Sequence, residues 1–270
     1  MGSGIADVCL RAGLSVVVVE RDTEALTVGI SRIKLAHDRA AKKGSMTAAE
    51  SDALIESITA STDFAAINAC DLIIEAVSEN PEIKSQTFAA IDAHAKADAI
   101  LATNTSSIPI ATIGSFTKRP ERVIGLHFFN PVQVLSLIEV VASDQTDPAI
   151  VETCVAFGRE TLGKKPIVCA DRSGFVVNAL LIPYLCSAIR MLEHHVASAA
   201  DIDTGMVEGC AHPIGPLALC DLIGLDTVEA IANTLATELR DETLRPPALL
   251  SAKVKAGELG RKTGAGFFTY

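Results

Sequence analysis

Residues 1–20 read MGSGIADVCLRAGLSVVVVE, and this stretch decides how the first half of the chain is organised. A helical pattern covers Ile5–Ala12, Gly13 stops it, and a run of valines follows that ends in Glu20. Near-continuous valine is typical of a strand that is buried on both faces. The segment therefore predicts a short helix followed by a buried strand with a carboxylate at its end.

The same alternation continues through about residue 170 and predicts an α/β domain built on a parallel sheet. β-branched runs alternate with helical stretches, which is typical of crossover connections that cover both faces of a sheet. The predicted strands are Ser15–Glu20, Asp71–Val77, Ala99–Thr103, Arg122–His127, Leu137–Val141 and Pro166–Cys169.

Two helices after the first strand are predicted to form a hairpin that projects from the sheet, at about residues 22–56. The first helix begins at Asp22 and ends near Lys43. The second helix opens at Thr47, and Glu50 three residues later completes a capping-box pattern.

The second half of the chain is predicted to be all-helical. The strand signal disappears after Ser173, and helical patterns interrupted by Gly and Pro take over. These patterns cover about residues 175–195, 199–209, 216–238 and 246–256. We therefore expect an α/β domain at residues 1–171 and an all-α domain at residues 172–270.

The opening segment also carries part of a dinucleotide-binding fingerprint. A Rossmann-type domain begins with a strand, G-x-G-x-x-G and a helix, and its second strand ends in an acid for the ribose hydroxyls. Gly2 matches the last glycine and Glu20 matches the acid, which favours NAD over NADP because a carboxylate repels a 2′-phosphate. Taken alone, both residues fit a capped helix and a strand-end carboxylate about as well.

The first strand of that fold, with its G-x-G, is missing from residues 1–20. In the usual strand order it lies between Ser15–Glu20 and Asp71–Val77, so both of these strands would face a gap. Two unpaired strand edges in a buried sheet are costly. We therefore expect the functional protein to carry an upstream strand with G-x-G, a hypothesis that the intact mass of the native protein tests.

Composition argues against several kinds of partner. The formal net charge of −10 argues against nucleic acid, because a phosphate-binding groove needs clustered Lys and Arg. No apolar run reaches the roughly 18 residues needed to span a bilayer, and no signal peptide is visible, so a cytoplasmic location is expected. The 7 cysteines include no C-x-x-C pair and predict buried, reduced thiols rather than disulfides or a metal site.

Polar residues follow two of the predicted strands. Ser106 comes just after Ala99–Thr103, and His127 ends the strand that leads to Asn130. Because ligands bind at the carboxyl ends of parallel strands, we expect these three side chains to share one crevice. Glu139 on the next strand can reach the His127 imidazole from a returning hairpin.

A histidine, a carboxylate and a hydroxyl fit the oxidation of an alcohol. Oxidation needs a base for the hydroxyl proton, and histidine serves well because it titrates near neutral pH. A carboxylate partner would fix the tautomer of the imidazole. For the isolated residues, a His127 that caps a strand end and a solvated Glu139 are an equally good interpretation.

Four motifs, in order along the whole chain, resemble the 3-hydroxyacyl-CoA dehydrogenase family, in particular its short-chain 3-hydroxybutyryl-CoA members of bacterial type. The resemblance implies reversible, NAD-dependent oxidation of an (S)-3-hydroxyacyl-CoA thioester in fatty-acid or butanoate metabolism, with acetoacetyl-CoA as the expected product. It also implies a homodimer formed through the C-terminal domain. The motifs are NTSS (104–107), HFFNP (127–131), SGFVVNALLIPYL (173–185) and GRKTGAGFFTY (260–270).

The resemblance also implies roles for individual residues. The implied catalytic residues are His127 as general base, Glu139 as its partner, Ser106 in contact with substrate and nicotinamide, and Asn178 at the thioester end. The implied cofactor contacts are Gly2, Glu20, Glu79, Lys84, Ser106 and Asn130. Without the resemblance, Lys84 would be interpreted as a solvated helix lysine.

The match to the family's coenzyme A contacts is incomplete. The family uses a serine and a lysine of the projecting hairpin; Lys43 matches the lysine, but the serine position falls on Ala36. Ser106 is the other residue expected to contact the coenzyme A thioester. No metal ligand set is predicted.

Two other functions remain open at this point. One is a relative that oxidises a free hydroxy acid, which saturation by the free acid but not by the thioester would favour. The other is an inactive, truncated homologue that acts as a dimeric binding or structural protein. A titration with NAD distinguishes this second alternative from an enzyme, because an inactive homologue would fold without binding NAD.

Overall fold

The computed structural model describes all residues from 1 to 270. The chain forms two compact units, Met1–Asp171 and Arg172–Tyr270. None of its helices combines the length and the apolar character required to cross a membrane.

The first unit is built on a sheet of 5 strands in the order β3-β4-β5-β6-β7. Neighbouring strands of this sheet are parallel, except that β6 runs antiparallel to β5, which agrees with the returning hairpin expected to bring Glu139 to His127. Residues 129–136 connect β5 to β6 without a helix, so the chain turns straight back. The strands are β3 (Leu72–Glu75), β4 (Ile100–Thr103), β5 (Val123–Phe128), β6 (Leu137–Ala142) and β7 (Lys165–Ala170).

The run of valines forms β1 (Val17–Val19), which is not part of this sheet. β1 pairs in parallel with β2 (Thr59–Ser61), and the two form a separate sheet. The sequence did not predict β2, because its three residues Thr-Ala-Ser are mostly exposed and lack the apolar β-branched pattern on which strand prediction depends.

Helices cover both faces of the larger sheet. Alternate strand residues such as Ile124 and Leu126 pack with α1 (Gly2–Arg11) and α6 (Pro148–Ala156). The other face packs against α5 (Ile110–Gly114), where a Cβ on Gly125 would come within 2.9 Å of the Ile110 side chain. A further helix, α4 (Pro81–His94), follows β3 in the chain.

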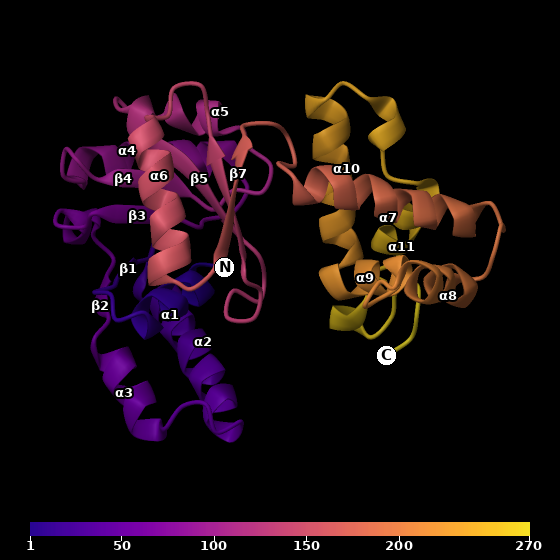
Figure 1. The fold of residues 1–270 in the computed structure, drawn as a ribbon, viewed down its shortest axis with the longest axis horizontal. Coiled ribbons are helices and arrows are strands. Elements are labelled where there is room, and N and C mark those ends of the chain that lie inside the picture. The colour runs from indigo at the N-terminus through magenta and orange to yellow at the C-terminus, as the bar shows by residue number, and fades with distance from the viewer. The chain divides into compact units, whose positions relative to one another are not determined.

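The predicted helical hairpin consists of α2 (Thr23–Lys42) and α3 (Ala48–Glu56), which extend side by side away from the larger sheet (Figure 1). The capping box is confirmed. The Thr47 hydroxyl accepts from the Glu50 N–H at 3.2 Å, and the Glu50 carboxylate accepts from the Thr47 N–H at 2.7 Å.

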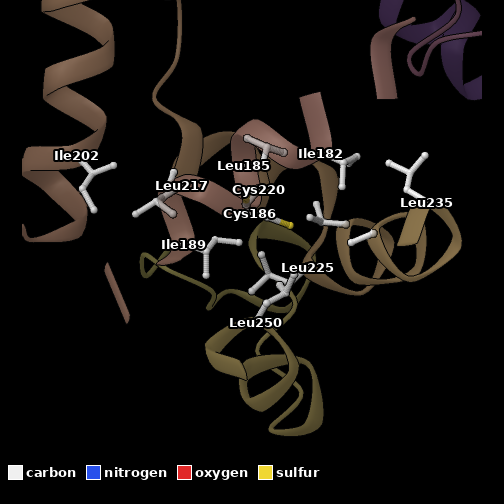
Figure 2. Close-up of a cluster of buried hydrophobic side chains, with 13 residues drawn as sticks. Ile182, Leu185, Cys186, Ile189, Ile202, Leu217, Cys220, Leu225, Leu235 and Leu250 are labelled. Atoms are coloured by element: carbon white, nitrogen blue, oxygen red, sulfur yellow. The ribbon is translucent and has the colours of Figure 1, made fainter. Parts of the chain in front are cut away.

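The second unit is helical, as predicted, with one correction. The predicted helix 216–238 is two helices that meet at Gly224, whose φ of 104° an L side chain rarely adopts. Aliphatic side chains from these helices form its core (Figure 2). The helices are α7 (Val177–Glu193), α8 (Ala199–Cys210), α9 (Pro216–Ile223), α10 (Leu225–Glu238) and α11 (Ala248–Lys255).

The core of the second unit also contains two aspartates that bind backbone. The Asp203 carboxylate accepts from the Leu217 and Ala218 N–H groups at 2.8 and 2.9 Å and so fixes the start of α9. Asp221 accepts from the Phe267 and Phe268 N–H groups, each at 2.9 Å. Asp221 therefore holds the closing segment 260–270.

The glycines of that closing segment serve packing. A Cβ at Gly266 would overlap the Asp221 carboxylate, and a Cβ at Gly260 would overlap the Asp221 backbone. Together with the Asp221 contacts, this explains the glycines of the segment by packing alone.

Candidate active site

His127 and Glu139 form a buried pair on neighbouring strands. They lie directly opposite each other in the β5–β6 register, and Nδ1 of His127 is 2.7 Å from a Glu139 carboxylate oxygen. Both side chains are buried. Because a carboxylate only accepts, Nδ1 is the donor. The pair therefore fixes the ring orientation, with Nε2 on the far side of the ring from Glu139.

The NTSS segment lies at the same end of the sheet as His127. It follows β4, whose Thr103 pairs with Gly125 of β5. Oδ1 of Asn104 then accepts from the Phe128 N–H at 2.9 Å. This hydrogen bond joins the residue after β4 to the residue after His127, so the backbone that carries Ser106 leaves the sheet beside the catalytic candidate.

Glu79 binds the NTSS segment from the loop that follows β3. Its carboxylate accepts from the Ser106 N–H at 2.5 Å and from the Thr105 hydroxyl at 2.8 Å. Three consecutive parallel strands thus deliver polar side chains that are bonded to one another at their carboxyl ends. This is the edge at which open α/β sheets bind ligands.

Lys84 is not the solvated helix lysine that the residue taken by itself would suggest. Its side chain is 1% exposed, and Nζ donates to both Glu75 carboxylate oxygens at 2.9 Å. Nζ is also 3.7 Å from Glu79. A buried cation needs such partners, because an unpaired charge in the interior is very costly. Lys84 therefore connects the sheet to the loop that holds Ser106.

Glu75 is a residue of this site that the sequence analysis did not single out. It is buried and also accepts from the Thr103 hydroxyl at 2.7 Å and from the Val77 N–H at 2.6 Å. A signal was available, since Glu75 is the only charged residue between Leu72 and Val77. A lone carboxylate in an apolar strand has to be paired when the strand is buried.

The cofactor candidates at the start of the chain lie on the elements predicted for them. Gly2 opens α1, and a Cβ there would lie 3.6 Å from the Cβ of Ala76, just after β3. Glu20 follows β1 and is half-buried. A helix N-terminus suits the pyrophosphate and a strand-end carboxylate suits the ribose, so the residues present fit a dinucleotide.

The remaining candidates are not joined to this cluster by a described contact. Asn130 is exposed beyond β5 and precedes Pro131 through a cis peptide bond. Lys43 is exposed at the end of α2. Asn178 is buried in the first turn of α7, in the second unit.

Four of the cysteines are buried, namely Cys9, Cys154, Cys186 and Cys220. All cysteines are free, and burial raises the pKa of the Cys9 thiol to about 11 and that of Cys154 to about 12, so neither is a thiolate at neutral pH. The prediction of buried thiols is wrong for Cys210, which is exposed. No group of three or more His, Cys, Asp and Glu side chains is placed to hold a metal ion.

Comparison with known proteins agrees with this geometry. Residues 1–172 match the family model described as the 3-hydroxyacyl-CoA dehydrogenase NAD binding domain, and residues 174–270 match the C-terminal domain of that family. The chain is 48% identical to a 3-hydroxybutyryl-CoA dehydrogenase of Mycobacterium tuberculosis, over all of this chain and 95% of the relative. It is 38% identical to the mitochondrial hydroxyacyl-coenzyme A dehydrogenase of Sus scrofa, over all of this chain and 88% of that protein.

A solved structure gives the same result. The crystal structure of the (S)-3-hydroxybutyryl-CoA dehydrogenase of Ralstonia eutropha superposes with a TM-score of 0.94 at 41% identity, covering all of this chain and 95% of that one. The two family models together span nearly the whole chain. The resemblance carried by the four sequence motifs is thereby confirmed, and the chain belongs to the 3-hydroxyacyl-CoA dehydrogenase family.

Proposed function

We propose that this protein oxidises (S)-3-hydroxybutyryl-CoA to acetoacetyl-CoA reversibly, as a 3-hydroxyacyl-CoA dehydrogenase that uses NAD. The observation that carries the proposal is the buried His127–Glu139 pair at the sheet edge where β4 and β5 end. The names of the relatives support the thioester substrate.

His127 is the proposed general base. Nε2 takes the proton of the C3 hydroxyl during oxidation and returns it to the carbonyl oxygen in the reverse direction. NAD, when bound, supplies the acceptor for the hydride that leaves C3. Glu139 holds the Nδ1 proton and the ring orientation, and it stabilises the imidazolium that forms when Nε2 is protonated.

The other candidates are proposed to bind and orient the reactants. Ser106 contacts the substrate and the nicotinamide, Asn178 positions the thioester, and Lys43 contacts coenzyme A. The proposed cofactor contacts are Gly2, Glu20, Glu79, Lys84 and Asn130. Glu79 supports the position of Ser106 directly, because it accepts from the Ser106 N–H.

We also propose a homodimer formed through residues 172–270. Several large apolar residues of this unit are exposed to solvent. The exposed fraction is 72% for Leu180, 63% for Val196 and 53% for Leu222. These side chains offer apolar surface that a second copy of the unit could bury. Sedimentation of the purified protein tests this part of the proposal.

The test of the activity is the oxidation of NADH by the purified protein with acetoacetyl-CoA, compared with free acetoacetate. We expect saturable turnover with the thioester and little with the free acid. Saturation by the free acid alone would favour a hydroxy-acid dehydrogenase. Folded protein that fails to bind NADH would favour a binding or structural role.

A further inference from the structure

A buried carboxylate outside the active site joins separate parts of the first unit. Asp7 of α1 is fully buried. Its Oδ1 accepts from Nε of Arg11 at 2.7 Å and lies 2.8 Å from Nε2 of His37 in α2. Its Oδ2 accepts from Nε2 of Gln133 at 2.9 Å. Asp7 therefore bonds the helix opened by Gly2 to α2 and to the loop that follows β5.

His37 extends this connection to α3. Its ring is fully buried, and Nδ1 lies 3.0 Å from the Ser51 hydroxyl. Nε2 must donate to Asp7, since a carboxylate only accepts, and the Ser51 hydroxyl can then donate to Nδ1. The chain of hydrogen bonds Asp7–His37–Ser51 thus crosses α1, α2 and α3 with every member satisfied.

The hairpin has almost no other buried attachment. Ile33 and His37 are the only buried residues of α2, and Ser51 is the only buried residue of α3. An element held by so little buried apolar surface moves easily unless specific bonds fix it. Buried hydrogen bonds of this kind fix one arrangement, because breaking them leaves polar groups without partners.

We propose that Asp7, His37 and Ser51 are positioning residues that hold the α2–α3 hairpin in place for the coenzyme A end of the substrate. The inference rests on the proposed function, since it takes the hairpin, with Lys43 at the end of α2, as the coenzyme A contact. Asp7, His37 and Ser51 are called the node below. Gln133 donates to Asp7 of this node from the loop that begins directly after β5, the strand of His127. The node therefore sets the position of the hairpin relative to the reacting carbon.

The test compares two substrates in the variant Ser51→Ala, which removes only the hydroxyl bonded to His37. The substrates are acetoacetyl-CoA and the same acetoacetyl group on N-acetylcysteamine, which lacks the nucleotide end. We expect KM for acetoacetyl-CoA to rise about three- to tenfold, the range that one buried hydrogen bond allows. The values of kcat, and kcat/KM for the short thioester, should stay within about twofold of wild type.

The matched control is Thr146→Val. Thr146 is buried and donates from its hydroxyl to the carbonyl of Val123, at the end of β5 away from His127. This variant also loses one buried hydroxyl of the first unit, but not in the hairpin. We expect it to leave the ratio of kcat/KM values for the two substrates unchanged. If Ser51→Ala does not fold, Gln133→Ala is used instead, because it alters an exposed residue. It should lower kcat/KM for acetoacetyl-CoA relative to the short thioester, by a smaller factor than is expected for Ser51→Ala.

A second readout does not depend on activity. Hydrogen–deuterium exchange of backbone amides in residues 23–56 should be faster in Ser51→Ala than in wild type and unchanged in Thr146→Val. Equal loss of kcat/KM for both thioesters, or unchanged exchange in the hairpin, would overturn the inference. Absence of thioester turnover by the wild-type protein would refute the proposed function instead, and the exchange experiment would still decide whether the node fixes the hairpin.

Discussion

The two units of the molecule use buried carboxylates in different ways. In the first unit, Glu139 pairs with His127 and Glu75 pairs with Lys84, so each carboxylate bonds an ionisable side chain. In the second unit, Asp203 and Asp221 each bond two backbone N–H groups, and Asp221 also accepts from the Tyr270 hydroxyl at 3.0 Å. Burial therefore does not separate the two uses. The bonding partner does, because a histidine or lysine partner can exchange a proton or bind a ligand, whereas a backbone N–H that is already bonded to a carboxylate does neither.

The largest expected effect is that of His127→Gln. The amide cannot take the hydroxyl proton, so kcat should fall roughly 10²–10⁴-fold. NAD affinity should change little, because the proposed cofactor contacts are intact. Steady-state turnover measures kcat, and a fluorescence titration with NADH measures the affinity for the cofactor. Near-normal turnover in this variant would refute the base assignment.

The corresponding change in the second unit is Asp221→Ala, which should affect stability rather than chemistry. It leaves the Phe267 and Phe268 N–H groups without their acceptor, and unfolding free energy should fall by about 3 kcal/mol. Denaturant unfolding measures the loss. Asp201→Ala is the control, since that exposed carboxylate bonds only at the start of α8. If Asp221→Ala kept its stability but lost NAD binding, the distinction between the units would fail.

Glu139→Gln tests the same distinction within the first unit. The amide can still accept from Nδ1 of His127 but carries no charge to stabilise the imidazolium. We expect kcat to fall about 10–100-fold, the usual effect of removing such a supporting partner. A drop in kcat with unchanged KM for acetoacetyl-CoA supports the role. Unchanged kcat with lowered stability would place Glu139 with the architectural carboxylates.

The sequence predicted more of the site than of the connections that support it. His127, Glu139 and Ser106 could be chosen as candidates because strand ends and four motifs mark them. The bonds of Glu75, Asp7 and His37 could not, because their partners lie on other elements and only the fold brings them together. The antiparallel turn into β6 was expected only as the hairpin that brings Glu139 to His127, because strand patterns by themselves do not reveal direction.

The smallest expected effect concerns the capping box of α3. The Thr47 backbone N–H and hydroxyl hold the pKa of the Glu50 carboxyl below its usual value of 4.5. This contribution to stability is therefore complete above pH 4.5 and is lost as the pH falls through the lower pKa of the folded state. Glu50→Gln should weaken the acid dependence of hairpin stability, seen as amide exchange in α3 at neutral and acidic pH. Identical acid dependence in both proteins would exclude Glu50 as its source.

The hydride can be followed from NADH to the substrate. Wild-type protein is mixed with acetoacetyl-CoA and NADH that carries deuterium at the transferring position of the nicotinamide, and the product is analysed by mass spectrometry. We expect 3-hydroxybutyryl-CoA with deuterium at C3. Folded protein that binds NADH yet yields no deuterated thioester would contradict it.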